Sequence, residues 1–108
     1  MINYCIAKEY TEIPGPRFRA EGEFSGEDFR ESVLIPMYKR AKSLKEDINI
    51  DLDGGYGYPT SFLEEAFGGL VRSLKEQISS AFVFKSDEEP ALIAEIKEYI
   101  LTEEKKLK

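Results

Sequence analysis

Residues 47–53, together with the two segments that follow them, form the pattern that most restricts the fold of this chain. Ile48, Ile50 and Leu52 alternate with polar residues, which predicts a strand with one buried face. The glycine-rich residues 54–59 cannot continue that strand, and apolar residues at helical spacing follow from residue 61. A strand, a glycine-rich loop and an amphipathic helix in this order indicate helices packed on a sheet.

The rest of the chain supplies more elements of both kinds. Further strands are expected at residues 2–8, 17–22 and 80–85. A Pro-Gly turn before residue 17 favours an antiparallel pairing of the first two strands. Helices are expected after Ser25 and after residue 86. The order β-β-α-β-α-β-α predicts an α/β fold, with a small mixed sheet of about four strands packed by three to four helices.

Residue types at the helix ends refine these expectations. Ser25 is a predicted N-cap, and Pro36 should kink the helix that follows or divide it in two. Ser61 and Glu64 have the spacing of a capping box. The two glycines at residues 68–69 lie inside the predicted helix, where each costs about 1 kcal/mol relative to Ala. We therefore expect another part of the chain to approach that helix closely.

Length and composition restrict both the organisation and the function. The 108 residues predict one domain, residues 1–108, with a frayed tail at 103–108. A net charge of −6 argues against binding to nucleic-acid phosphates or to anionic membranes. The absence of histidine excludes imidazole catalysis and imidazole metal ligation, and the single cysteine excludes an internal disulfide. The N-terminus shows no signal peptide, so a cytoplasmic location is expected.

Several short motifs between residues 13 and 74 resemble the STAS-like domain family of unknown function, a prokaryotic family. The first block comprises Gly-Pro-Arg-Phe at 15–18, Gly22, and Ser-Gly-x-x-Phe-Arg at 25–30. The second comprises Ile-Asp-Leu-Asp-Gly at 50–54 and Ser-Phe-Leu-x-Glu-Ala-Phe-Gly-Gly-Leu at 61–70. The second block is the more specific, because it combines a strand, its turn and the following helix.

This resemblance implies a distant similarity to anti-sigma factor antagonists. In those proteins an ATP-binding, histidine-kinase-like partner phosphorylates a Ser or Thr at a helix N-terminus, and the phosphate switches a protein–protein interface. The corresponding position here is Ser61, with Thr60 as its neighbour. The resemblance therefore implies a regulatory protein-binding module with a phosphoacceptor at Ser61 or Thr60, which is not an enzyme and needs no cofactor.

The same segment predicts where a partner would bind. Tyrosines beside flexible glycines are typical of recognition surfaces, because they add contact area at low entropic cost. The predicted protein-binding residues are Gly54, Gly55, Tyr56, Gly57, Tyr58, Pro59, Glu64 and Glu65. One or both tyrosines could instead pack on the sheet. Arg17, Arg19 and Arg30 are expected to pair with the acidic residues at 21–28, or one of them with a phosphate on Ser61.

Two alternatives to the regulatory module stay open from sequence. The first is a small divalent-cation- or nucleotide-binding domain that uses Asp51 and Asp53 beside the glycines. In the contrasting structural interpretation, Asp51 lies on the far face of the strand and Asp53 braces the turn through an Asx-type hydrogen bond. The second alternative is a constitutive subunit of a larger complex, such as a phage or defence-system component. The oligomeric state is not predicted.

Overall fold

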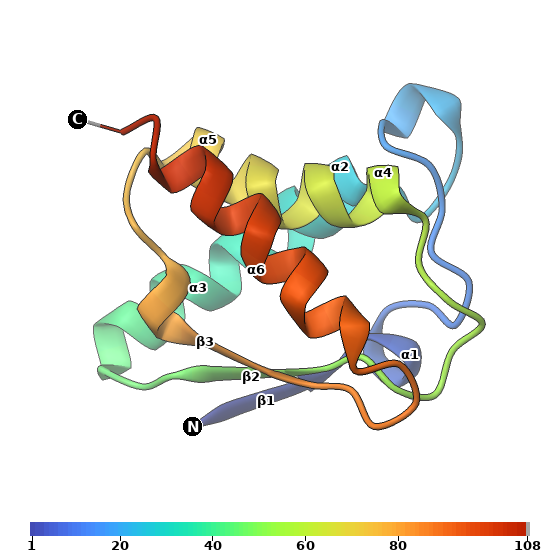
Figure 1. Ribbon diagram of the computed structural model, residues 1–108, viewed down its shortest axis with the longest axis horizontal. Helices are drawn as coiled ribbons and strands as arrows, with labels where there is room; N and C mark the ends of the chain where they lie inside the picture. The colour runs from blue at the N-terminus through green and yellow to red at the C-terminus, as the bar shows by residue number, and fades with distance from the viewer. Residues whose placement is uncertain (108) are drawn as a thin grey trace.

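The computed structural model describes residues 1–107 and contains a three-stranded parallel sheet (Figure 1). The strands are β1 (Ile2–Cys5), β2 (Ile48–Asp51) and β3 (Phe82–Lys85), in the order β1-β2-β3. Ile50 of β2 lies opposite Tyr4 of β1 and Phe84 of β3. The α/β class is confirmed, but the sheet has three strands and is parallel throughout, not mixed.

Two long helical segments connect the strands and a third follows them. The first consists of α2 (Gly26–Phe29), η2 (Arg30–Leu34) and α3 (Ile35–Leu44), and the second of α4 (Thr60–Leu63), η3 (Glu64–Gly68) and α5 (Gly69–Leu74). The third is α6 (Ala91–Glu104). The short elements are α1 (Ile6–Glu9), η1 (Arg19–Glu21) and η4 (Ser79–Ala81). In each connecting segment the middle portion, η2 or η3, is a π-helical turn.

All the long helices lie on the same side of the sheet (Figure 1). Parallel β-α-β crossovers are right-handed in nearly all proteins, and two that step the same way, from β1 to β2 to β3, place their helices on the same face. The opposite face carries the alternate side chains of each strand, with Asn3, Asn49 and Val83 in one row. Such an uncovered face is unusual for a parallel sheet. The side chains of Asn3 and Asn49 on this face can hydrogen-bond to water.

The predicted strand at residues 17–22 is wrong. Residues 19–21 form the 3-10 helix η1, and the backbone around them bonds to residues 24–27 instead of to β1. Glu27 N–H donates to Arg17 C=O at 2.9 Å, and Gly15 N–H donates to Phe24 C=O at 2.8 Å. A strand with an alternating sequence is stable when the side chains on one of its faces are buried. Here Phe18 is 46% exposed and Arg19 is also exposed. The apolar residues of this alternating segment are therefore not buried in the core, and the alternation does not produce a strand.

The first long helix confirms one prediction and refines another. Ser25 is the N-cap, since its Oγ accepts a hydrogen bond from Asp28 N–H at 3.0 Å. Pro36 neither divides the helix nor stops it. It has no N–H to donate and its ring would crowd the carbonyl of Ser32 in a regular α-helix. The π-helical turn Arg30–Leu34 widens the helix just before this point, so the chain continues as α3.

The C-terminal residues are ordered where the structure describes them. The sequence predicts fraying at 103–108, yet α6 extends to Glu104, and Glu103 and Glu104 are both buried. Glu104 Oε2 accepts hydrogen bonds from Ile78 N–H at 2.6 Å and from Ser79 N–H at 3.0 Å. These bonds tie the end of α6 to the loop that leads into β3. Residue 108 lies outside the described residues.

An aromatic cluster joins the helices to the covered face of the sheet. Phe29 and Phe62 come from the two connecting segments, with ring centroids 5.6 Å apart. Phe67 packs edge-on against Phe84 at 5.5 Å, and all three side chains from the helices are completely buried. This cluster holds the second helical segment, and with it the loop at residues 54–59, in a fixed position over the sheet. Within residues 1–107, no helix has the length and apolar character needed to cross a bilayer.

We predict that Phe67→Ala lowers the free energy of unfolding by about 3–5 kcal/mol, because it opens a cavity between the helices and the sheet. Urea denaturation followed by circular dichroism measures the change. The matched control is Phe18→Ala, at a side chain that is 46% exposed, which should change stability by less than about 0.5 kcal/mol. Equal losses from the two variants would contradict the packing described above.

Candidate functional site

The glycine-rich loop and the start of α4 form an accessible corner of the molecule, which we call the Tyr56–Thr60 corner (residues 56–60). Gly54 and Gly57 have φ angles of 97° and 113°, which L-amino-acid side chains rarely adopt, so the loop needs glycine at both positions. Tyr56 is 81% exposed, the most exposed large hydrophobic side chain of the described residues. Gly57, Pro59 and Thr60 are also exposed.

The two loop tyrosines have different roles. The Tyr58 ring packs near Phe62, with centroids 6.3 Å apart, and its hydroxyl donates to Leu52 C=O at 3.0 Å. Burial raises the pKa of the Tyr58 phenol well above its ordinary value. Tyr58 therefore anchors the loop to the end of β2. Tyr56 is the tyrosine that is available to a partner.

The helix begins two residues earlier than its capping pattern predicts. The N-cap is Pro59, whose carbonyl accepts from Leu63 N–H at 3.2 Å, and no side chain caps the helix. Thr60 is the first helical residue and is exposed, and Ser61 is the second and is half-buried. The predicted Ser61–Glu64 capping box is wrong, because arginine side chains take the Glu64 carboxylate. The first-turn N–H groups are left for water or a ligand.

Glu64 and Glu65 sit in a network of arginines instead of at the free surface. Arg17 Nη1 donates to Glu64 Oε1 at 2.6 Å and to Glu65 Oε1 at 3.2 Å. Arg72 Nη1 donates to Glu64 Oε2 at 2.7 Å. Together these guanidinium groups hold the pKa of the Glu64 carboxyl below its ordinary value, with Arg72 making the larger contribution. Arg72 also lies 3.4 Å from Glu103 of α6, which links the network to the C-terminal helix.

Arg30 forms the buried end of this network. Its Nη1 bonds to the Glu65 carboxylate and also donates to the Glu65 carbonyl at 3.1 Å. Arg30 and Glu65 are each 8% exposed. A Cβ atom on Gly69 would lie 2.6 Å from Arg30 Nη1, so a side chain there would collide with the guanidinium. This is the close approach that the mid-helix glycines predict. Gly26 permits a second close contact, with the Phe62 carbonyl.

Asp51 and Asp53 stabilise the ends of the strands. Asp51 is on the uncovered face as predicted, but the Asx-type bond belongs to Asp51 and not to Asp53: its Oδ1 accepts from Asp53 N–H at 2.9 Å. The Asp53 carboxylate instead accepts from Asp87 N–H at 2.9 Å, Glu88 N–H at 3.0 Å and Lys85 Nζ at 3.1 Å. The backbone N–H groups of Asp87 and Glu88, followed by Lys85, lower the pKa of Asp53.

The loop after β3, residues 86–89, completes the site. The sequence predicts these residues as the start of the last helix, which is wrong, because α6 begins at Ala91. Glu88 Oε1 accepts from Gly54 N–H at 2.8 Å, which fastens residues 86–89 to the glycine-rich loop. Between the two loops is a hollow of about 240 Å³. Its lining combines Tyr56 and Tyr58 with Asp53, Glu88 and Glu89. The position at the carboxyl ends of parallel strands is the usual ligand-binding position in α/β sheets. No group of three or more Cys, Asp or Glu side chains among residues 1–107 is arranged to hold a metal ion.

The arrangement of strand, loop and helix agrees with a comparison against protein families. A family model for the STAS-like domain of unknown function (DUF4325) matches residues 25–91. The chain belongs to this family. The match includes the specific block at residues 50–70 that carries the resemblance, and it extends through β3 to the start of α6. The motifs at residues 15–22 lie outside it. No curated protein and no solved structure matches the chain.

We predict that Arg30→Ala in this STAS-like domain costs about 3–5 kcal/mol of stability, because it leaves the Glu65 carboxylate buried without its closest cation. The control is Arg19→Ala. Arg19 contacts Asp28 and Glu31 but is 47% exposed, so water screens these ion pairs and its removal should cost far less than the removal of Arg30. Chemical denaturation of both variants provides the measurement. A cost for Arg30→Ala no larger than that of the control would show that the buried pair is not needed for folding.

Asp53 should make stability dependent on pH. Its pKa is lowered in the folded protein, so its contribution is fully present above the ordinary carboxyl pKa of about 3.9 and is lost as the pH falls towards the folded value. Asp53→Asn should therefore lower the melting temperature at neutral pH. The difference from the wild type should shrink as the pH falls below about 4.

The control for this titration is Asp47→Asn, at an exposed carboxylate before β2 that makes no side-chain hydrogen bond within residues 1–107. The melting temperatures of the wild type and the two variants are compared from neutral pH to below about pH 4. A melting-temperature difference for Asp53→Asn that stays constant with pH would contradict the role assigned to its charge.

Proposed function

We propose that this STAS-like domain is a regulatory protein-binding module whose partner contacts the Tyr56–Thr60 corner. The observation that carries the proposal is the 81% exposure of Tyr56 beside an exposed, uncapped helix start. A large aromatic side chain is costly to leave in water and adds contact area at low entropic cost when a partner covers it. The surrounding contacts hold the loop in place, so a partner meets a preformed surface.

The proposed regulatory group is the Thr60 hydroxyl, with Ser61 as the second candidate. Thr60 is exposed whereas Ser61 is half-buried, so a modifying enzyme reaches Thr60 more easily. A phosphate there is favoured by the helix dipole and by the first-turn N–H groups. Glu64 lies one helical turn further along and holds both Arg17 and Arg72. A phosphate on Thr60 would therefore compete for these cations and change the charge of the surface.

The proposed partner is an ATP-binding, histidine-kinase-like protein, as the resemblance to anti-sigma factor antagonists implies. We infer a binding function and not a catalytic one, because the two loop aspartates are engaged in internal hydrogen bonds that shape the loops. Gly54–Pro59 and Thr60 form the proposed contact surface. Glu64 and Glu65 lie next to this surface and stabilise it by binding arginine side chains.

The modification is tested by phosphate-specific mass spectrometry on the domain isolated from its native host. We predict phosphate on Thr60 or Ser61, and loss of that signal in the Thr60→Ala, Ser61→Ala double variant. The control is Thr102→Ala, at an exposed threonine of α6. A domain that is never modified at residues 60–61 would contradict the switch and favour a constitutive subunit.

The interface is tested with the partner that co-purifies with the domain. Tyr56→Ala and Thr60→Glu are each expected to weaken binding by about tenfold or more, equivalent to about 1.4 kcal/mol. Isothermal titration calorimetry measures the affinity of the partner for each variant. The control is Phe18→Ala, at an exposed aromatic side chain elsewhere, which should leave the affinity unchanged. Unchanged affinity in both variants would contradict the proposed contact surface.

A further inference from the structure

The outer edge of β3 carries main-chain groups that nothing in the described chain satisfies. Leu52 N–H donates to Lys85 C=O at 2.8 Å, so Lys85 directs its main-chain groups towards β2. In a parallel ladder this direction alternates, which turns the N–H and C=O groups of Phe82 and Phe84 outwards. Of these four groups, Phe82 N–H donates to Ser79 C=O at the end of η4, and no hydrogen bond within residues 1–107 reaches the other three, which are Phe82 C=O and the N–H and C=O of Phe84. They form a template for another strand.

The opposite edge of the sheet is not equally available. Ile2 N–H donates to Asp47 C=O at 2.9 Å, so the alternation turns Asn3 and Cys5 outwards on β1. Glu9 Oε2 already accepts from Cys5 N–H at 2.9 Å. Glu9 of α1 thus occupies an outward N–H group of β1, whereas the outward N–H of Phe84 on β3 has no such partner within residues 1–107.

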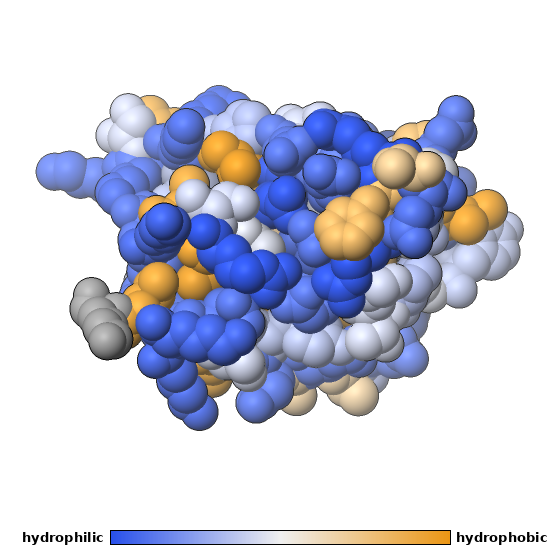
Figure 2. Space-filling view, turned by 90° about the horizontal axis from the view of Figure 1, so that it is seen from above, coloured by the Kyte–Doolittle hydropathy of each residue, from blue (hydrophilic) through white to orange (hydrophobic). Residues whose placement is uncertain are grey.

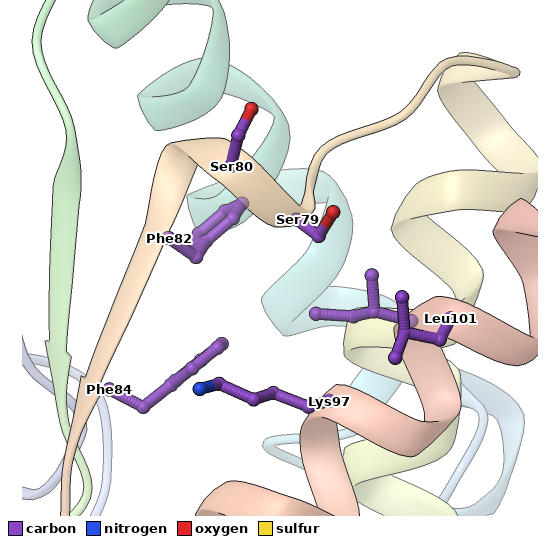
Figure 3. Close-up of a pocket in the computed structure, with 7 residues that line it drawn as sticks. Ser79, Ser80, Phe82, Phe84, Lys97 and Leu101 are labelled. Atoms are coloured by element: carbon purple, nitrogen blue, oxygen red, sulfur yellow. The ribbon is translucent and has the colours of Figure 1, made fainter.

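A groove runs beside the free edge, between β3 and α6 (Figure 3). Its volume is about 290 Å³. The stacked rings of Phe82 and Phe84, with centroids 5.9 Å apart, point from β3 towards α6, and Leu101 of α6 faces them. Ile100 of α6 also lines the groove. Leu101 is 42% exposed, whereas Phe82, Phe84 and Ile100 are buried, so Leu101 is the part of the apolar lining that is open to solvent. Seen from the side of the helices, the molecule is otherwise largely hydrophilic, with scattered apolar residues (Figure 2).

Lys97 supplies a single charge to this groove. Its ammonium group extends towards Phe84 (Figure 3), and its neighbours one helical turn away are Ile93 and Leu101. No carboxylate lines the groove, and Lys97 makes no ion pair within residues 1–107. In a chain of net charge −6, this cation lacks the acidic partner that most of the arginines have.

We propose that the β3 edge binds an extended acidic segment of a partner protein as a fourth strand of the sheet. The Phe82 C=O and the N–H and C=O of Phe84 pair with its backbone. Alternate side chains of an added strand face the helices, so an apolar residue enters the groove and a carboxylate two positions away meets Lys97. This surface shares no residue with the Tyr56–Thr60 corner, and the proposal does not depend on the proposed function.

A second copy of the chain fits this edge less well. Two β3 strands paired antiparallel about Val83 would bring Phe82 opposite Phe84 and place both Lys97 side chains over the joint sheet. With no carboxylate in either groove, the two cations would be left without counter-charges. An acidic segment from a different protein supplies the missing charge.

The test uses a displayed library of random peptides of roughly ten residues, about the upper length of a strand. The library is selected on the wild-type domain and, in parallel, on Lys97→Glu. The matched control is Lys39→Glu, at an exposed lysine of α3 that makes no ion pair within residues 1–107. Melting temperatures confirm that all three proteins are folded.

We expect the wild type and the Lys39→Glu control to enrich peptides with an apolar and an acidic residue two positions apart. For such a peptide the Lys97→Glu substitution should weaken binding by about tenfold, equivalent to about 1.4 kcal/mol. In ¹⁵N-labelled protein the peptide should shift the amide signals of Phe82 and Phe84 and slow the hydrogen exchange of the Phe84 amide, which has no partner within residues 1–107. The amide of Cys5 should stay unchanged.

Three results would overturn the proposal. They are failure to enrich any peptide, binding that is equal in the wild type and Lys97→Glu, and amide shifts confined to β1 or to the Tyr56–Thr60 corner. Concentration-dependent protection of the Phe84 amide without peptide would also overturn it, because the occupant would then be a second copy.

Discussion

The handedness of two crossovers determines most of what this small domain presents to its surroundings. Both connections step in the same direction across a three-stranded parallel sheet, so both place their helices on one face. The carboxyl ends of β2 and β3 consequently meet at one end of the molecule, beneath the loops that follow them. The glycine-rich loop and the loop after β3 are thereby brought into contact, with Glu88 bonded to Gly54. The same topology leaves β3 as an outer strand.

Packing between the two connecting helical segments gives this arrangement its rigidity. Phe29, Phe62 and Phe67 fill the space above the sheet, and Gly26 and Gly69 allow the backbones and the Arg30 guanidinium to approach. The buried Arg30–Glu65 pair adds specificity at a cost in desolvation, since Arg30 Nε has no hydrogen-bond partner in the described residues. A loop supported in this way keeps Tyr56 and Thr60 exposed without being loose. That combination suits recognition by another protein.

Local patterns predicted the elements whose burial is decided locally. The alternation at Ile48, Ile50 and Leu52 and the cap at Ser25 were sufficient to place β2 and the start of α2. Local patterns gave wrong predictions where contacts with residues distant in sequence determine the structure. Residues 17–22 alternate like a strand, but no partner strand is available and the loop bonds to residues 24–27 instead. Glu64 has capping-box spacing, yet Arg17, 47 positions away in sequence, takes its carboxylate. Local sequence patterns could not identify the hydrogen-bond partners of residues 17–22 or the arginine that binds Glu64. The expected pairing of Arg17 with the acidic residues at 21–28 is absent.

Photo-cross-linking in the native host would show whether this STAS-like domain acts through the Tyr56–Thr60 corner. Benzoylphenylalanine would replace Tyr56 in one strain and Phe18, also exposed, in another. We expect a discrete covalent adduct with one protein from position 56, which is lost when Thr60 is changed to Glu, and no such adduct from position 18. No adduct from position 56, or the same adduct at equal yield from both positions, would contradict it.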